Sequence, residues 1–287
     1  PSFADTAPGP APMVAWIISA DRERREISMA ERYLSPVLRD FPNIAHHTAP
    51  LRGVEAAIYN GLWRPIVDGK LKPGAKLRED IICETFDVSR TLVRKVMVIM
   101  EQEGIVQLPP NHGAYVAAPS PDEARNVNEA TRLIGLYAVS QLAAPGYLLS
   151  NENAERIERH IALQSEAEDN NDFALARILT GEFYILLTHI YGNPILAGQF
   201  ESLVTRFLLA RTLYQADGYH PVRAELHRDI LRHIQSNEQE AAVAKVTDVF
   251  DSIERSLRFD VGDDEDALRA VLAGDHGAAP RAAKRRS

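Results

Sequence analysis

Two arginines, Arg90 and Arg94, stand four residues apart in the segment RTLVRKVMVIMEQEG. If this segment is a helix, both side chains lie on one face in its first turns. Long cationic side chains at the start of a helix can reach guanine edges and phosphates in the major groove of DNA. Ser89 and Thr91 add short hydroxyl donors suited to phosphate. On its own, such an arginine pair more often marks the solvated face of a surface helix. The neighbouring elements therefore decide between DNA contact and a solvated face.

The elements that must position these arginines are predicted within residues 53–118. Apolar periodicity predicts a helix in VEAAIYNGLWRPIVDG, and the turn LKPG separates it from a short helix in LREDIICETF, whose acidic first turn suits the helix dipole. Ser89 is placed to cap the third helix, which ends at Gly104. The arginines therefore belong to the third of three consecutive helices.

A β-hairpin is predicted directly after the third helix. Residues 105–108 and 114–116 read as two strands, and His112 and Gly113 lie at the tip of the turn between them. A glycine at the tip lets the backbone approach a phosphate or the minor groove closely. Three helices followed by a hairpin are the winged helix-turn-helix plan, which favours DNA contact over a merely solvated arginine face.

The segment from LKPG to GAYV resembles the DNA-binding domain of the GntR family of transcription regulators. The matching residues are Pro73, Gly74, Leu77, Glu79, Val88, Ser89, Arg90, Thr91, Val93, Arg94, Glu103, Gly104, Gly113 and Val116. Asp87, Leu92 and Lys95 depart from the usual glycine, proline and glutamate, which affects turn detail and local charge. With this resemblance, we expect Arg78, Ser89, Arg90, Thr91, Arg94, His112 and Gly113 to contact operator DNA.

Length and charge are compatible with this interpretation. A chain of 287 residues favours two domains, and its net charge of −8 alone argues mildly against nucleic-acid binding. The acidity is concentrated in the second half, because residues 52–118 carry nine Lys/Arg and eight Asp/Glu. The single cysteine, Cys83, excludes an intramolecular disulfide and a zinc site made of cysteines. Without an apolar run of roughly 18 to 20 residues, we expect a cytoplasmic protein with no membrane segment.

The sequence after Ser120 predicts helices almost throughout. Ser120 and Glu123 form a capping box, and six helices fit residues 120–261 with no strand-like alternation. The expected fold class is mainly α, with a winged helix-turn-helix at 53–118 followed by an all-α antiparallel bundle. Residues 1–52 are expected to form an extension with one helix near 21–40, and residues 262–287 a disordered tail.

The helical region resembles the FCD-type effector domain of the FadR subfamily. The resemblance rests on EATRLIGLYAVSQLAA, GEFYILLTHIYGNPIL and ELHRDILRHIQSNEQEAA. It implies a small-molecule site within the bundle. The residues expected there are Arg132, Thr180, Tyr184, Asn193, Arg206 and His227.

Many such domains hold a divalent metal through an aspartate and a histidine four residues apart and two later histidines. By the resemblance, these positions correspond here to Thr180, Tyr184, His227 and Val249, so His227 alone retains a ligand. One histidine cannot form a site, and valine offers no donor atom. We therefore expect no metal cofactor. His189 and His220 restore a site only if the helices depart from the family register.

Two interpretations of the altered positions stay open. In one, Thr180, Tyr184 and His227 bond an effector directly, and Arg206 or Arg211 pairs with its carboxylate. In the other, the same residues are ordinary bundle core, and the arginines pair with the acidic surface.

The sequence thus predicts a dimeric transcription regulator that binds a palindromic operator and responds to a small metabolite, by family resemblance an organic acid. A repressor is favoured, although an activator stays open. The alternatives are an enzyme within the bundle, for which no catalytic motif is present, and a protein-interaction module. The extra N-terminal helix is expected at the dimer interface or on the DNA-binding domain.

Overall fold

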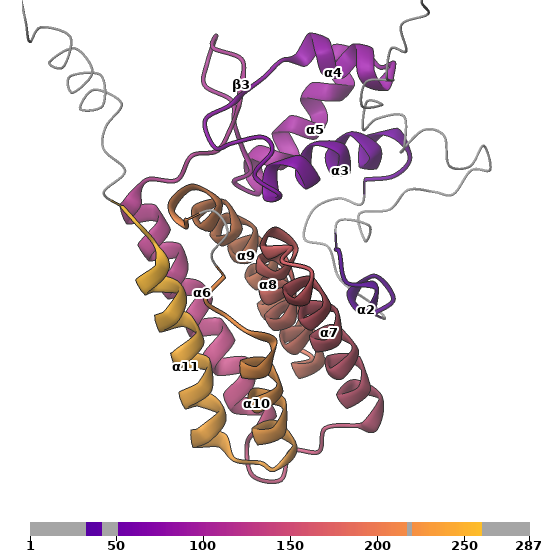
Figure 1. Cartoon of the computed structure of the whole chain (residues 1–287). Coiled ribbons are helices and arrows are strands. Elements are labelled where there is room, and N and C mark those ends of the chain that lie inside the picture. The colour runs from indigo at the N-terminus through magenta and orange to yellow at the C-terminus, as the bar shows by residue number, and fades with distance from the viewer. Residues whose placement is uncertain (1–32, 42–50, 217–219, 260–287) are drawn as a thin grey trace, which may run out of the picture.

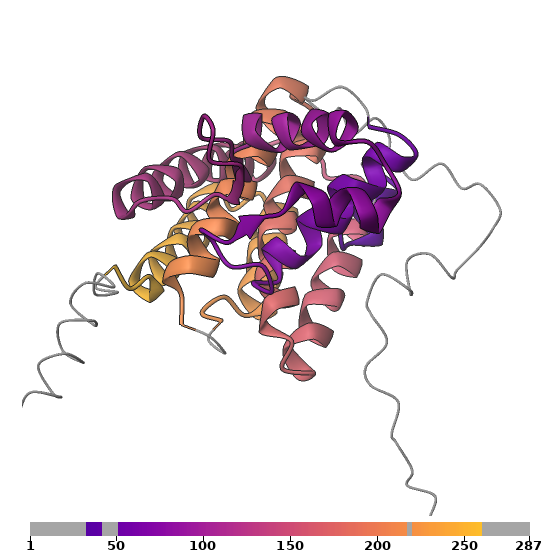
Figure 2. The ribbon, with the colours of Figure 1, turned by 90° about the horizontal axis from the view of Figure 1, so that it is seen from above.

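The computed structural model describes residues 33–41, 51–216 and 220–259. Figure 1 shows a small domain of three helices and a hairpin set against a larger bundle of six long helices. Seen from above in Figure 2, the small domain lies across one end of the bundle. The expected fold class, a winged helix-turn-helix followed by an all-α bundle, is confirmed.

The small domain contains three helices and a three-stranded antiparallel sheet of order β1-β3-β2. The helices are α3 (Val54–Val67), α4 (Glu79–Phe86) and α5 (Arg90–Gln102), and the strands are β1 (Lys76–Leu77), β2 (Val106–Gln107) and β3 (Ala114–Val116). Strand β1 departs from the sequence prediction, in which Leu77 begins the second helix; in the structure this helix begins at Glu79. Two residues are too few to show an alternating pattern, and the strand is defined by its pairing of Lys76 with Tyr115.

Local sequence explains the short turn between α4 and α5. Asp87 ends α4 in the left-handed conformation, at φ 51°. The family pattern that this segment resembles has glycine at this position. Aspartate tolerates this region better than most residues, so the departure preserves the turn. Ser89 then caps α5 as predicted, since its Oγ accepts the N–H of Leu92 at 3.4 Å.

The larger domain is a bundle in which α8 is the central helix. Its helices are α6 (Pro121–Leu142), α7 (Asn151–Asp169), α8 (Phe173–Tyr191), α9 (Pro194–Tyr214), α10 (Ala224–Gln235) and α11 (Gln239–Ser256). Helix α8 packs against α6, α7 and α9, and from Ala176 to Thr188 every residue is buried. A helix buried on all sides reads as apolar all round, which agrees with its sequence.

Helix α8 is also long and apolar enough to cross a membrane by length and composition. However, 67% of its apolar window is buried inside the bundle. It also carries Thr180, Glu182 and Thr188, all buried. These properties match the core helix of a helical bundle.

A continuous apolar core joins the two domains. Helix α3 packs on α9, and a short helix, α2 (Pro36–Arg39), packs on α7 (Figure 1). Within the expected helix near 21–40, the described residues contain only α2, and the remainder lies outside them. The expected tail at 262–287 also lies outside the described residues.

Gly181 sets the distance between α8 and α9. A Cβ atom at this position would lie 2.7 Å from Cγ1 of Val204. We expect Gly181→Ala to lower the free energy of unfolding by about 1 to 3 kcal/mol, because the packed helices must move apart. Urea unfolding measures the change.

Gly135→Ala is the matched control, because an added Cβ there would meet its nearest neighbour, Phe250, at 3.4 Å. We expect it to be neutral or to stabilise α6 by up to about 1 kcal/mol through helix propensity. Equal destabilisation by both substitutions would contradict the packing explanation.

Candidate DNA interface and effector site

The predicted recognition face is exposed at the start of α5. Arg90, Thr91 and Arg94 are exposed, whereas Val93 and Met97 on the same helix are fully buried. Figure 1 shows α4 and the hairpin on the side of the domain away from the bundle, with α3 nearer to it. The arginines are therefore accessible to a duplex.

Two arginines of this face are engaged in surface ion pairs. Nε of Arg94 lies 3.1 Å from Oε2 of Glu79 on α4, and Nη2 of Arg78 lies 2.6 Å from Oδ2 of Asp80. Both arginine side chains are more than 60% exposed, at 70% and 63%. Exposed pairs contribute little stability, so either guanidinium can exchange its carboxylate for a phosphate at low cost.

The wing supplies a second exposed edge. His112 and Gly113 are exposed at its tip, and Gly113 has φ 87°, a conformation that glycine adopts without strain. Lys76 on β1 lies beside this tip, with its ammonium 5.7 Å from the Tyr115 ring centroid. Sequence reasoning missed Lys76, because nothing in the pattern LKPGAKL showed that it pairs with the wing strand.

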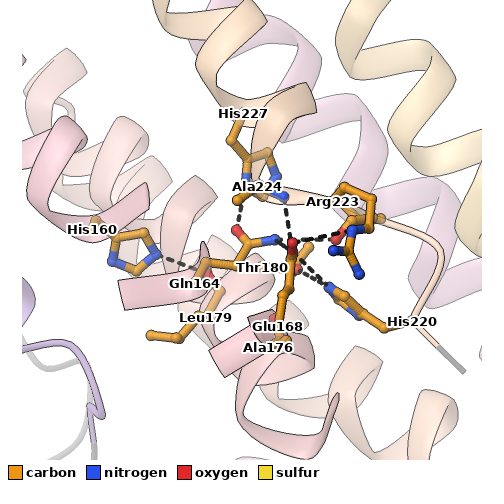
Figure 3. Close-up of polar contacts among 11 residues, drawn as sticks. His160, Gln164, Glu168, Ala176, Leu179, Thr180, His220, Arg223, Ala224 and His227 are labelled. Atoms are coloured by element: carbon orange, nitrogen blue, oxygen red, sulfur yellow. Dashed lines mark hydrogen bonds and ion pairs between the residues drawn. The ribbon is translucent and has the colours of Figure 1, made fainter. Parts of the chain in front are cut away.

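Three of the expected effector residues are brought together inside the bundle. The Tyr184 and His227 rings pack edge to face with centroids 5.6 Å apart. Thr180 Oγ lies 3.4 Å from Nε2 of His220, a histidine outside the expected set. Figure 3 shows Thr180, His220 and His227 converging from α8, the segment before α10, and α10. Thr180, Tyr184, His220 and His227 are called the polar cluster below.

Helix α7 supplies further polar partners that sequence reasoning missed. Oε1 of Gln164 accepts a hydrogen bond from Nδ1 of His227 at 2.6 Å, and the amide nitrogen of Gln164 donates to Glu168 at 3.0 Å. Glu168 also accepts the N–H of Ala224 at 2.8 Å and pairs with Arg223 at 3.2 Å (Figure 3). Gln164 and Glu168 are four residues apart on α7 and therefore lie on one face of the helix. This spacing is the feature of the sequence from which the pair could have been predicted.

Several buried polar atoms near the cluster have no hydrogen-bond partner among the described residues. They are the Tyr184 hydroxyl, Nε2 of His227, Nδ1 of His220 and Nη2 of Arg211. Arg211 is 1% exposed, and it acts electrostatically on His220 together with Arg177. Buried polar groups are nearly always paired in folded proteins, so these four atoms lack the partners that such groups usually have.

The cluster does not fit a divalent metal. At three of the four family ligand positions, Thr180 is a hydroxyl donating to Ala176, Tyr184 is a phenol, and Val249 is an alkyl group. Burial raises the pKa of Tyr184, so its oxygen stays protonated and is a poor ligand. Among the described residues, no three histidine, cysteine or carboxylate groups gather as a metal requires.

The other three expected effector residues lie elsewhere. Arg132 pairs with Asp251 of α11 at 2.6 Å, and exposed Asn193 caps α9 by accepting the N–H of Leu196. Arg206 lies against Gly104, between the two domains. The expectation that all six residues line one site is therefore corrected.

Burial shifts the protonation of the interior histidines and of Glu182. It lowers the pKa of His160 to about 4 and that of His220 to about 3, and it holds the pKa of His227 well below its ordinary value. Burial raises the pKa of Glu182 to about 7, although two backbone N–H groups oppose the rise. The folded chain therefore keeps these imidazoles neutral at pH 7.

We expect the free energy of unfolding to fall as the pH is lowered from about 6.5 to 4.5. Below about pH 6.5 the three histidines bind protons in the unfolded chain but not in the folded one, so acid favours unfolding. Glu182 acts oppositely between about pH 4.5 and 7. Each proton contributes about 1.4 kcal/mol per pH unit, so three imidazoles outweigh one carboxyl. Urea unfolding across this range measures the slope.

Two variants separate the opposing contributions. Glu182→Gln is expected to steepen the fall, because it removes the carboxyl that opposes it, and His160→Gln to make it shallower. An unchanged slope in both variants would contradict the assignment of these groups.

The exposed recognition helix and its wing define a winged helix-turn-helix DNA-binding protein, and the polar cluster lies in the helical domain attached to it. The model for bacterial regulatory proteins of the gntR family matches residues 55–116, and the FCD domain model matches residues 127–252. Together these matches span more than half of the chain. The chain belongs to the GntR family, carries an FCD domain, and is a transcriptional regulator.

Individual relatives agree with this assignment. The HTH-type transcriptional repressor RspR of Escherichia coli is 27% identical over 212 residues, which cover 73% of this chain and 91% of the relative. The uncharacterized HTH-type transcriptional regulator YdhC of Bacillus subtilis is 25% identical over 189 residues, covering 64% and 82%.

Solved structures share the fold. A putative GntR transcriptional regulator from a Rhodococcus species superposes with a TM-score of 0.63 at 20% identity, covering 71% of this chain and 99% of that one. McbR/YncC of Escherichia coli gives 0.58 at 16% identity, covering 79% and 100%. At these identities the likeness extends to the fold alone.

Proposed function

We propose that this regulator binds a palindromic operator in the cytoplasm as a homodimer and acts as a repressor. The observation that carries the proposal is the exposed face of Arg90, Thr91 and Arg94 at the capped end of α5, beside the wing. The name of the Escherichia coli relative supports repression. Two-fold pairing would present two such faces to two half-sites.

Exposed apolar side chains support association of two copies. Leu133 and Tyr137 on α6 are 62% and 48% exposed, and Ile195 at the start of α9 is 73% exposed. The Tyr137 hydroxyl lies 3.2 Å from that of Tyr191, which joins α6 to the end of α8. Large apolar groups gathered at a surface favour burial against a partner.

We also propose that an anionic metabolite, such as an organic acid, binds directly at the polar cluster without a metal. Four unpartnered buried atoms support this, and two of them, the Tyr184 hydroxyl and Nη2 of Arg211, are hydrogen-bond donors. Burial and the nearby Arg177 lower the pKa of Arg211, so a bound anion would relieve an electrostatic cost. Ligand binding there would then bias the arrangement of the domains.

We expect Arg90→Ala to weaken operator binding by about 1 to 3 kcal/mol, or roughly 5- to 150-fold, because an exposed contact to a base or phosphate is lost. The operator is selected from random duplexes with the wild-type protein. Fluorescence anisotropy at fixed salt measures the affinity for this duplex. The stoichiometry of the complex at saturation reports whether two chains bind each duplex.

Lys95→Ala is the matched control, because it removes the same charge from the same helix. The Lys95 ammonium lies 2.7 Å from Glu55 of α3. The family pattern described above has glutamate at position 95, so this lysine is not part of the expected DNA contact. We expect less than a threefold effect. Operator affinity that is unchanged by Arg90→Ala would contradict the DNA interface, and single-chain binding would contradict the dimer.

In a thermal-shift screen of carboxylic acids, we expect at least one compound to raise the melting temperature of the protein, since ligands that bind the folded state stabilise it. Tyr184→Phe should weaken the best hit by about 3- to 10-fold, because one hydrogen bond is lost. Tyr147→Phe, on a half-buried tyrosine in the loop after α6, removes the same atom and should leave affinity unchanged.

Two outcomes contradict the effector proposal. One is an equal effect of the two tyrosine substitutions. The other is stoichiometric zinc, nickel or manganese in the purified protein, which would show that the altered positions still hold a metal.

A further inference from the structure

A segment preceding the DNA-binding domain is docked on the helical domain. Residues 33–41, called the strap below, lie before both family matches, which begin at residues 55 and 127. Tyr33, Val37 and Leu38 are 3%, 7% and 0% exposed. Helix α2 within the strap packs on α7 (Figure 1). Within one chain, the strap therefore lies on the helical domain.

A buried carboxylate of the central helix holds the strap. Glu182 is 3% exposed and accepts the N–H of Leu34 at 2.7 Å through Oε1 and the N–H of Ser35 at 2.8 Å through Oε2. Both oxygens are thus engaged by strap backbone. Without the strap, a carboxylate in the middle of α8 would lose these two partners, which makes docking specific.

A buried histidine forms the second anchor. Nδ1 of His160 lies 2.9 Å from Ser35 Oγ, and Nε2 lies 2.8 Å from the carbonyl oxygen of Leu179. Ser35 and His160 are both fully buried. Because both ring nitrogens are occupied, the imidazole ties the strap to α7 and α8 together.

Aromatic contacts anchor the far end of the strap. The Phe41 ring lies 5.6 Å from that of His189, and the Arg156 guanidinium lies 5.2 Å above it. These contacts come from α8 and α7. The strap is therefore fixed at both ends on the same pair of helices.

The strap is also close to the DNA-binding domain. Leu51, which leads into α3, is buried in the same apolar core as Tyr33 and Leu38. Arg64 of α3 and Arg39 of the strap both act electrostatically on Glu182. One carboxylate of the helical domain thus lies within the influence of strap and α3.

We propose that the strap is an intramolecular clamp that holds the winged helix-turn-helix domain in position on the helical domain, so that its release changes operator affinity. This rests on the proposed DNA-binding function. The clamp acts through the Leu34 and Ser35 contacts to Glu182 and His160 and through burial of Val37 and Leu38.

The test uses Val37→Asp in the full chain, which places a charge in the docked face without altering either domain. Pro36→Asp is the matched control, because Pro36 is exposed one residue away. Trypsin cleavage after Arg39 under native conditions reports docking. We expect at least tenfold faster cleavage in Val37→Asp and a wild-type rate in Pro36→Asp.

Operator affinity of the same proteins tests the clamp. We expect Val37→Asp to change affinity at least threefold relative to Pro36→Asp. Ser35→Ala, which removes only the bond to His160, should shift cleavage and affinity in the same direction by less. Cooperative thermal unfolding confirms that each variant is folded.

The possible failures are distinguishable. Equal cleavage of all proteins would show that the strap is not docked, and fast cleavage with unchanged affinity would show that docking does not position the DNA-binding domain. Either overturns the proposal. If the wild-type protein selected no DNA, the proposed function would fail, while a shared cleavage rate would still overturn docking.

Discussion

Helix α8 is surrounded by protein and still carries polar side chains, and each of these needs a partner within the fold. Thr180 bonds a carbonyl one turn back, and Glu182 receives two N–H groups from the strap. The Tyr184 hydroxyl has no partner among the described residues. Unpaired polar groups are costly in a core. Thr180 therefore makes a structural contact, Glu182 forms the docking site of the strap, and Tyr184 belongs to a candidate ligand site. Successive stretches of one helix thus connect packing with regulation.

The two domains handle charge differently. On the DNA-binding domain, Arg90 and Arg94 are exposed, and Arg94 pairs with Glu79 only at the surface. In the helical domain, Arg211 is fully enclosed beside Arg177 and neutral histidines. A weakly held surface arginine is suited to a large, readily exchanged anion such as DNA, whereas an enclosed one is suited to a small anion that sheds its water.

Much of the fold was predictable because strong local signals specify it. The caps at Ser89 and Ser120 and the long periodic helices need no distant partner, and they are confirmed. Strand β1 exists only through its pairing with the wing. Arg206 was in the set of residues expected at the effector site and Arg211 was not, but five residues on a helix separate the two by about 140°, and it is Arg211 that faces inward. No sequence pattern near Ser35 predicts that its N–H bonds to Glu182 of α8.

The strap also has a consequence for biosynthesis. Glu182 follows Ser35 by 147 residues. At roughly 5 to 20 residues per second, the ribosome completes the docking site roughly 7 to 30 seconds after the strap has been made. The DNA-binding domain is synthesised within that interval and can fold before α8, the docking site of the strap, has been made. A nascent chain therefore carries a finished DNA-binding domain that is still free to turn, and it acquires its restrained form only when α8 has joined the bundle.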